Sequence, residues 1–475
     1  MAKIVFLQQS SFGMFGPMQI SALLKKQGHS CDLLMQPREK NIVQKLIGLR
    51  PDLVAFSVVT NEFSWAAKTA AEFRRRSSAP VLFGGVHATF CPDECLALDA
   101  VDMVCVGEGE QALLEVADYF DREHTLPEGI ANCWIKKDNA IVRNPVRPPT
   151  QDLDSLPWPD RDLYYARYPS LAGYPVKSFM SGSGCPYECS YCCNKGLALL
   201  YKDKGRLLRK RSVKNVIDEI VWVSARWPLR TIAFIDDEFA YDLKWLGDFC
   251  QQYKSKVNKP FYCLIRLELM DEERVKLLAD AGCYVVHFGI ESGSEPLREQ
   301  VLHRRIGNPM IVEKAALLKK YGLKFNAYNM LNIPGETIED GFETVEINIK
   351  IGTDYPWCSL IQPYPGTFLW AQLIRQGGSP HHVYPGDSFY NTSPILQPDT
   401  QKLKNLQKLF YLAVKVPQLG GLIRKIVSLP ANPIFELIFI LTFLRRHLAA
   451  ERLTLLEEIR FNAQHLGLYF RRNKK

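Results

Sequence analysis

The chain has 475 residues, enough for two to four domains with sizeable cores, so a small disulfide-stapled module is excluded. Its composition is that of an ordinary globular protein, with 47% hydrophobic and 23% charged residues, which excludes disordered, collagen-like and solenoid architectures. The net charge of +8 is concentrated at one end, because residues 401–475 hold 14 Lys and Arg against 4 Asp and Glu. This concentration argues against a nucleic-acid-binding protein, which would spread its cations over a large face.

The opening residues, Met1 to Leu7, lack the basic region, the long apolar stretch and the small-residue cleavage site of a secretory signal. We therefore expect a cytoplasmic protein. Thirteen cysteines in a long chain of this kind indicate metal or redox chemistry and core packing rather than a disulfide framework.

The first 136 residues alternate between strand and helix patterns. Strands are predicted at Lys3–Gln8, Cys31–Met35, Leu53–Val59, Val81–Phe83 and Met103–Val106, and helices at Pro17–Gly28, Ile42–Leu49 and Ser64–Arg76. Apolar strands separated by helices are typical of a parallel, doubly wound sheet whose ligand binds at the strand carboxyl ends. The sequence therefore predicts an α/β protein with a Rossmann-like first domain over residues 1–136.

A second α/β domain is predicted after residues 137–175, where seven prolines indicate a linker and covering loop. Six strand-like runs follow, at Val176–Ser181, Thr231–Asp236, Phe261–Ile265, Tyr284–Ile290, Lys324–Met330 and Cys358–Gln362. They alternate with helical patterns such as Val213–Ala225 and Asp271–Ala281. Residues 176–375 are therefore predicted to form a partial (β/α)6 barrel of the TIM type, with its chemistry at the carboxyl ends of the strands.

Residues 376–475 are predicted to form a helical C-terminal region. The run Ile434–Leu444 is apolar apart from Glu436, but it is shorter than the ~20 residues that a membrane-spanning helix needs. Lys and Arg residues on both sides of the run fit an interfacial helix that contacts anionic lipid at the inner membrane face or a hydrophobic substrate. A core helix with basic neighbours is the alternative explanation.

Three cysteines, Cys185, Cys189 and Cys192, lie within eight residues directly after the first strand of the second domain. Soft thiolates at such tight spacing indicate a metal centre. A zinc site or a four-cysteine cluster would need a fourth protein ligand, whereas three thiolates leave one iron of a [4Fe-4S] cluster open. Cys193 follows at once and is interpreted as a packed thiol. Three buried cysteines, or a zinc site completed by a remote residue, are the alternatives.

With Tyr191 in its aromatic position, this motif resembles the Cys-x3-Cys-x-aromatic-Cys motif of the radical S-adenosylmethionine (SAM) superfamily. The resemblance implies a partial (β/α)6 barrel in which Cys185, Cys189 and Cys192 bind a [4Fe-4S] cluster and SAM chelates the open iron. It also implies reductive cleavage of SAM to methionine and a 5′-deoxyadenosyl radical. The electron would come from an external reductant of the flavodoxin or ferredoxin type.

The same resemblance assigns SAM-binding roles to residues at the ends of successive barrel strands. Relatives contact the amino group after the second strand, the carboxylate and ribose after the third and fourth, and the adenosine along the fifth. The residues that carry these roles here are Tyr191, Asp236, Asp237, Arg266, Glu291, Ser292 and Asn329. Surface ion pairing and polar turns are the alternative explanations for the charged members.

The first domain resembles the cobalamin-binding domain that precedes the barrel in one radical SAM subgroup. The resemblance is carried by Phe83–Thr89 and Gly107–Glu110, in the order and spacing of that domain. The candidate cobalamin contacts are Ser10, Ser11, Gly84, Gly85, His87, Gly107, Glu108 and Gly109. The loop Gln8–Gly16 contains no histidine, so a lower cobalt ligand from this loop is not expected, and a domain that no longer binds cobalamin is an alternative. Nearby Cys91 and Cys95 are interpreted as buried packing thiols.

These resemblances imply a radical SAM enzyme of the cobalamin-dependent methyltransferase type that methylates an unactivated carbon of a small, hydrophobic substrate. One SAM would supply the methyl group through cobalamin, and a second would supply the radical. A cobalamin-dependent cyclase or rearrangement enzyme, like those that act on tetrapyrroles, is the alternative within enzymes. A non-catalytic iron-sulfur or corrinoid protein is the alternative from another class, although such a protein needs no open iron.

Overall fold

The computed structural model describes residues 1–138, 140–378, 384–386, 388 and 390–462, and the chain forms two compact units. Unit 1 comprises residues 1–173 and 196–207 together with the chain from Ile459 onward. Unit 2 comprises Tyr174–Lys195 and Leu208–Glu458. Each unit has its own sheet, and the strands of each sheet are mostly or wholly parallel.

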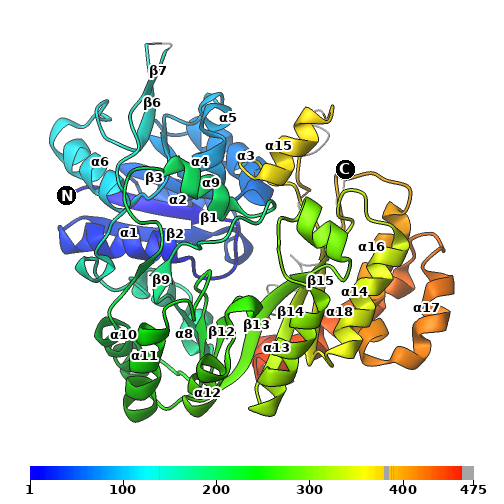
Figure 1. The fold of residues 1–475 in the computed structure, drawn as a ribbon. Helices are drawn as coiled ribbons and strands as arrows, with labels where there is room; N and C mark the ends of the chain where they lie inside the picture. The colour runs from blue at the N-terminus through cyan, green and yellow to red at the C-terminus, as the bar shows by residue number, and fades with distance from the viewer. Residues whose placement is uncertain (139, 379–383, 387, 389, 463–475) are drawn as a thin grey trace. The chain divides into compact units, whose positions relative to one another are not determined.

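Unit 1 is built on a seven-stranded sheet in the order β2-β1-β3-β4-β5-β6-β7 (Figure 1). Its strands are β1 (Lys3–Gln8), β2 (Ser30–Met35), β3 (Leu53–Ser57), β4 (Val81–Gly84), β5 (Met103–Cys105), β6 (Cys133–Lys137) and β7 (Ala140–Arg143). The first five pair in parallel and the last two are antiparallel. The predicted doubly wound domain is therefore confirmed, with strand bounds within two residues of the predicted ones.

Helices cover both faces of this sheet because side chains alternate along each strand. Val5 and Leu7 of β1 pack in one core with residues of α2 (Ile42–Gly48) and α3 (Phe63–Arg74). Ile4 and Phe6 are buried on the opposite face. The remaining long helices, α1 (Phe15–Lys26) and α6 (Glu110–Glu123), lie side by side (Figure 1).

The segment predicted as a linker belongs to unit 1 up to Gly173. The predicted boundary at residue 136 falls within β6, because this short polar hairpin lacks the apolar alternation that marks the other strands. Tyr164 of this segment donates a hydrogen bond to Gln8 Oε1 (2.5 Å). Gln8 Nε2 in turn donates to the carbonyls of Ser10 and Phe12 (2.9 and 2.7 Å), so the proline-rich segment holds the loop that follows β1.

Unit 2 contains a six-stranded, wholly parallel sheet in the order β15-β14-β13-β12-β11-β8. Its strands are β8 (Val176–Phe179), β11 (Thr231–Phe234), β12 (Phe261–Leu264), β13 (Cys283–Glu291), β14 (Lys324–Leu331) and β15 (Tyr355–Leu360). The pairing ladder between described strands stops at β8 and β15, so the sheet is an open, partial barrel as predicted. The last strand begins three residues earlier than predicted, because Pro356 is tolerated on an edge strand.

The helices of the barrel follow their strands in turn: α10 (Val213–Arg226), α11 (Leu243–Lys256), α12 (Glu272–Asp280), α13 (Asn308–Lys320) and α14 (Ile338–Lys350). Polar side chains cap several of them. The N-cap residues Ser212, Asp242, Asp271 and Thr337 each accept a hydrogen bond from a backbone N–H of the first turn. These caps fix where each helix begins and therefore the length of the loops at the strand ends.

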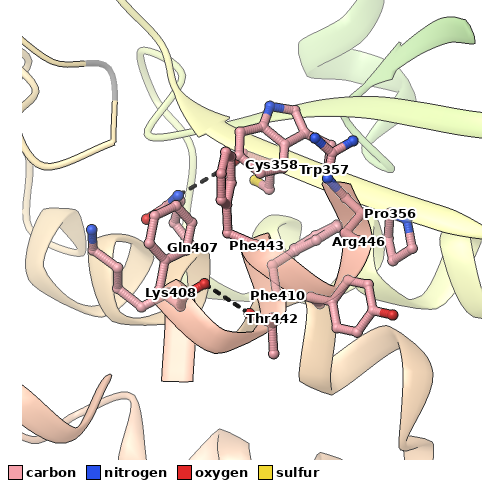
Figure 2. A pocket seen from close by; sticks show the side chains of 11 residues that line it. Pro356, Trp357, Cys358, Gln407, Lys408, Phe410, Thr442, Phe443 and Arg446 are labelled. Atoms are coloured by element: carbon pink, nitrogen blue, oxygen red, sulfur yellow. Dashed lines mark hydrogen bonds between the residues drawn. The ribbon is translucent and has the colours of Figure 1, made fainter. Parts of the chain in front are cut away.

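The C-terminal region is helical, as predicted, with α16 (Thr400–Lys415), α17 (Gly420–Ile426), α18 (Pro433–Ala450) and α19 (Leu455–Asn462). Figure 2 shows side chains of α16 and α18 meeting Trp357 and Cys358 of β15 around a cavity of about 10 Å³. That volume holds at most one water molecule, so this cavity is too small for a substrate. The side chains around it pack α16 and α18 against β15. Arg446 lies over the Trp357 ring, 4.2 Å from its centroid.

Helix α18 has a buried side and an apolar exposed side. Arg446 is half-buried against Trp357 of the barrel edge, whereas Ile434, Leu437 and Leu441 are 65%, 55% and 57% exposed. A core helix with basic neighbours, the alternative considered above, would not expose these apolar side chains. In the part of the chain that the structure describes, no helix is long and apolar enough to cross a membrane.

Candidate active site

The three motif cysteines lie on the loop between β9 (Gly182–Ser183) and α9 (Cys193–Leu200), beyond the carboxyl end of β8. Backbone hydrogen bonds of Ser190 hold this loop at both sides. Its N–H donates to the carbonyl of Leu302 (3.0 Å), and its carbonyl accepts from the N–H of Leu369 (2.8 Å). The loop is therefore fixed by elements at the carboxyl ends of later strands.

The thiols of this loop lie in surroundings that suit metal-bound thiolates. Arg266 Nη1 donates to Cys189 Sγ (3.2 Å), and the guanidinium stacks 4.0 Å from the centroid of the Tyr187 ring. Burial raises the pKa of Cys185 to about 12, and the hydrogen bond with Cys193, together with burial, raises the pKa of Cys192, so a thiolate here needs a nearby cation. Three sulfur donors beside a guanidinium fit an iron-sulfur cluster in chemistry and in charge.

A buried ionic network lies at the ends of β12 and β13. Arg266 donates to Glu268 Oε1 (2.6 Å), and Arg304 lies 3.6 Å from Glu268 Oε2 and 3.8 Å from Glu291 Oε1. Tyr191 donates to Glu291 Oε1 (3.0 Å). Two arginines thus balance two glutamates inside the protein, and no side chain of the four is more than 15% exposed.

The position of the Glu291 carboxylate depends on a neighbouring glycine. A Cβ atom at position 289 would lie 1.8 Å from Glu291 Oε1, so only glycine leaves room for the carboxylate to fold back along β13. Glu291 itself has a positive φ of 72°, which is strained for a residue with a side chain. Backbone and glycine together aim this carboxylate at Tyr191 and Arg304.

Several buried polar atoms of the network make no hydrogen bond within the described residues. They are Arg266 Nε, Arg304 Nε and Nη2, Glu268 Oε2 and Glu238 Oε2. Buried polar atoms are nearly always satisfied in native proteins, so these atoms indicate room for a polar ligand. The amino, carboxylate and hydroxyl groups of SAM fit them, because both donors and acceptors are open.

The two aspartates predicted after the second strand have different surroundings. Asp236 is buried and accepts hydrogen bonds from the N–H (3.0 Å) and hydroxyl (2.5 Å) of Ser181, with the Lys210 ammonium 3.2 Å away. Asp237 is exposed, and its charge raises the pKa of both Cys185 and Cys192. Asp237 therefore lies beside the cysteine loop, whereas Asp236 braces the strand end.

Asn329 is not brought together with the other candidates. Its side-chain amide donates to the carbonyls of Ala327 (3.0 Å) and Trp357 (2.9 Å) and accepts from Asn348 of α14 (2.8 Å). Because side chains alternate along a strand, position 329 shares the helix-facing side of β14 with Phe325 and Ala327. Ser292 is also buried, and its hydroxyl accepts from the N–H of Ser294 (3.2 Å).

Sequence reasoning missed Lys210, Glu268 and Arg304, which complete the polar surroundings of the site. Glu268 lies two residues after Arg266, and this spacing could have indicated a second charged residue at the same strand end. Lys210 ends the two-residue strand β10 (Arg209–Lys210) and Arg304 lies in the loop after β13, and nothing in their local sequence distinguishes them from surface cations.

The candidate cobalamin residues of unit 1 follow β1, β4 and β5, at the carboxyl edge of the sheet. The strand order 2-1-3-4-5 reverses between β1 and β3, and a ligand of such a sheet binds in the crevice there. Phe12 and Val86 expose 46% and 41% of their surface at this edge. Exposed apolar side chains beside small residues fit the flat ring of a corrinoid.

Two of the candidate glycines are also required by the packing of unit 1 itself. Gly85 and Gly107 have φ values of 95° and 86°. A Cβ at Gly85 would lie 2.7 Å from the Val58 carbonyl oxygen, and one at Gly107 would lie 2.3 Å from the Tyr201 hydroxyl. The same hydroxyl accepts from the N–H of Glu108 (2.7 Å). Ser11 is buried, and Ser10 lies in the loop fixed by Gln8.

The imidazole ring of His87 is not exposed to solvent. It is 1% exposed, its Nδ1 lies 3.3 Å from Thr60 Oγ1, and its Nε2 lies 3.7 Å from Glu94 Oε2. The imidazole is therefore held among side chains of unit 1.

Comparison with known proteins identifies two families. Residues 14–117 match the B12 binding domain, and residues 180–347 match the radical SAM superfamily. An uncharacterized methyltransferase of Pyrococcus horikoshii is 29% identical over 331 residues, which is 68% of this chain and 70% of that protein. The anaerobic magnesium-protoporphyrin IX monomethyl ester cyclase of Rubrivivax gelatinosus is 24% identical over 76% of this chain and 64% of its own length.

Among solved structures, the cobalamin-dependent SAM radical enzyme OxsB with aqua-cobalamin and SAM bound has a similar fold. The TM-score is 0.68 at 14% identity, over 98% of this chain and 76% of that chain. The first match covers β2 to β5 of unit 1, and the second covers β11 to β14 of unit 2. The chain therefore combines a B12-binding domain with a radical SAM domain, and this combination implies a [4Fe-4S] cluster, SAM and cobalamin as cofactors.

Proposed function

We propose that the protein methylates an unactivated carbon of a small, hydrophobic molecule. The observation that carries the proposal is the fixed loop of Cys185, Cys189 and Cys192, whose three thiols lie beside a buried Arg and Glu network with open hydrogen-bonding atoms. Three protein ligands leave an open iron, which an electron carrier does not need. The methyltransferase relative and the B12-binding domain support methyl transfer as the reaction.

The residues of this chain have positioning roles in that reaction. When bound, the cluster supplies the electron that cleaves SAM, and cobalamin carries the methyl group. Arg266 and Arg304 offer guanidinium N–H groups to the carboxylate of SAM, since some of these groups are buried without a partner among the described residues. Tyr191 fixes the Glu291 carboxylate before any ligand arrives, which lowers the entropy lost on binding.

Asp237 lies beside the cysteine loop and fits contact with the amino group of SAM. Ser292 and Asn329 fit supporting roles, because their side chains are satisfied within the fold. An external one-electron reductant of the flavodoxin or ferredoxin type is part of the proposal, since cleavage of SAM consumes one electron.

Cyclisation or rearrangement is the second candidate, favoured by the similarity to a tetrapyrrole cyclase. Methyl-deuterated SAM distinguishes the two reactions. The reduced, reconstituted protein is incubated with a bacterial lipid and pigment extract, and products are compared by mass spectrometry. Methyl transfer predicts a product that carries the intact deuterated methyl group. A new product that forms with consumption of SAM but contains no deuterium would contradict methyl transfer and favour cyclisation.

We further propose that the protein contacts the inner membrane face through α17 and α18, where a hydrophobic substrate would be available. Ile434, Leu437 and Leu441 lie on one exposed stripe of α18, and Leu422 and Leu429 expose 54% and 48% of their surface nearby in sequence. The C-terminal segment is strongly basic, and its exposed cations include Lys425 and Arg445. Apolar residues flanked by cations are typical of a helix at an anionic lipid surface.

Replacing Leu437 and Leu441 together by Asn should lower binding to vesicles that contain anionic lipid by about tenfold or more. The reason is that two leucine side chains would no longer insert into the lipid. Cosedimentation measures the bound fraction. The matched control replaces two exposed apolar residues of barrel helices, Val221 and Met310, by Asn. Equal binding of the two double variants, or no binding by the unmodified protein, would contradict membrane contact.

A further inference from the structure

A second group of metal-ligating side chains lies in unit 1, far along the chain from the cysteine motif. His87 of α4 (Val86–Phe90), Cys91, and Glu94 of α5 (Pro92–Leu96) each offer one ligand atom, and these atoms all lie within 4.8 Å of one another. The His87 Nε2 to Glu94 Oε2 distance is 3.7 Å. Imidazole, thiol and carboxylate therefore meet at one point.

The backbone explains why these three side chains converge. Cys91 joins the two short helices, and its N–H donates to the carbonyl of His87 (2.8 Å), four residues earlier. Residues four apart in a helical turn lie on the same side, so the His87 and Cys91 side chains are neighbours. Glu94 follows three residues later, in the first turn of α5.

The surroundings of His87 prepare its Nε2 to act as a ligand. Its Nδ1 lies 3.3 Å from Thr60 Oγ1, and its ring packs 4.2 Å from the centroid of the Phe63 ring. A hydrogen bond at one ring nitrogen sets the tautomer and orients the other nitrogen toward a metal. Burial lowers the pKa of His87 to about 4, which favours the neutral imidazole that a metal ligand requires.

We propose that His87, Cys91 and Glu94 bind one Zn²⁺ ion. Nitrogen, sulfur and oxygen ligands suit zinc, whereas calcium and magnesium prefer oxygen ligands alone. The Cys91 thiol releases its proton to solvent on binding, and the resulting thiolate and the Glu94 carboxylate then balance the two charges of the cation. Three protein ligands leave the fourth tetrahedral position to a water molecule.

A divalent cation at this point would contact both the Cys91 sulfur and the Glu94 carboxylate. The site would tie α4 to α5 directly behind the Gly84 and Gly85 turn, and it assigns His87 a role other than contact with cobalamin.

The test is the zinc content of the full-length protein, reconstituted anaerobically with iron, sulfide and cobalamin, loaded with ZnCl2 and desalted. Elemental analysis should give about one zinc per chain, falling at least about fivefold in Cys91→Ser and in Glu94→Gln. Cys95→Ser is the matched control, since this buried thiol lies one turn further along and outside the group. It should retain the zinc.

Iron and cobalt are measured in the same samples. Unchanged iron and cobalt in the variants would show that the protein is folded and that zinc is not bound by the cluster cysteines. The Glu94→Gln variant changes an exposed side chain, so it keeps the test decisive if Cys91→Ser does not fold. No zinc in the unmodified protein, or equal zinc in Glu94→Gln, would overturn the proposal.

Discussion

Replacing Cys185 by Ala should abolish formation of 5′-deoxyadenosine from SAM, to the background of the protein-free reaction. In the proposed site the cluster has three protein ligands, so the loss of one would leave two thiolates for four irons. Iron content and visible absorption of the reconstituted variant should fall with the activity. The same result is expected for Cys189→Ala and Cys192→Ala, because each thiol is proposed to supply one ligand.

Cys193→Ala is the matched control for this prediction. Cys193 is adjacent to Cys192 and is the first residue of α9. If it is a packed thiol, its removal should leave iron content and nucleoside formation within about twofold of the unmodified protein. Loss of the cluster in Cys193→Ala together with its retention in Cys185→Ala would contradict this assignment of the ligands.

Replacing Arg304 by Met should lower the free energy of unfolding by about 3–5 kcal/mol, because it leaves Glu268 and Glu291 buried with one cation in place of two. Arg304 is 3% exposed and lies between these carboxylates. Denaturant unfolding of the reconstituted protein, followed by circular dichroism, measures the change. Arg305→Met alters the exposed neighbour and should change stability by less than about 0.5 kcal/mol.

The loss of unfolding free energy in Arg304→Met should also depend on pH. Burial raises the pKa of Glu291, and the Arg304 charge opposes this rise, so the variant raises the pKa further. When the pKa of a carboxyl is higher in the folded than in the unfolded protein, its ionisation destabilises the fold. The free energy of unfolding therefore falls as the pH rises from the unfolded-state pKa through the folded-state pKa. The difference from the unmodified protein should therefore be smaller at about pH 5 than at about pH 8. An equal loss at both values, or equal behaviour of Arg304→Met and Arg305→Met, would contradict the network.

The sheets of both units could be predicted from sequence because their strands are short apolar runs at regular intervals. Lys3–Gln8 and the six barrel strands were found within a few residues of their observed bounds. The β6 and β7 hairpin was missed because it is short, polar and outside the β/α alternation. Its pairing with β5 depends on tertiary contacts that no local pattern reports.

Some residues of the candidate site could likewise be predicted from the sequence, and others could not. The cysteine loop, Arg266 and Glu291 were found because they follow predicted strands, and strand ends meet at one edge of a barrel. Asn329 was placed with them, although the alternation along β14 turns its side chain toward α14. Arg304 was missed because its role depends on burial between two glutamates, and burial of a single cation is not visible in sequence.

The central claim is that three thiolates in this chain hold a cluster whose open iron cleaves SAM, in a protein that also has a cobalamin-binding domain. The direct measurement is anaerobic reconstitution with iron, sulfide and hydroxocobalamin, followed by desalting, counts of iron and cobalt, and addition of reductant and SAM. The account predicts about four irons and about one cobalt per chain, with 5′-deoxyadenosine formed only when reductant is present. Four irons per chain with no 5′-deoxyadenosine under reducing conditions would contradict it.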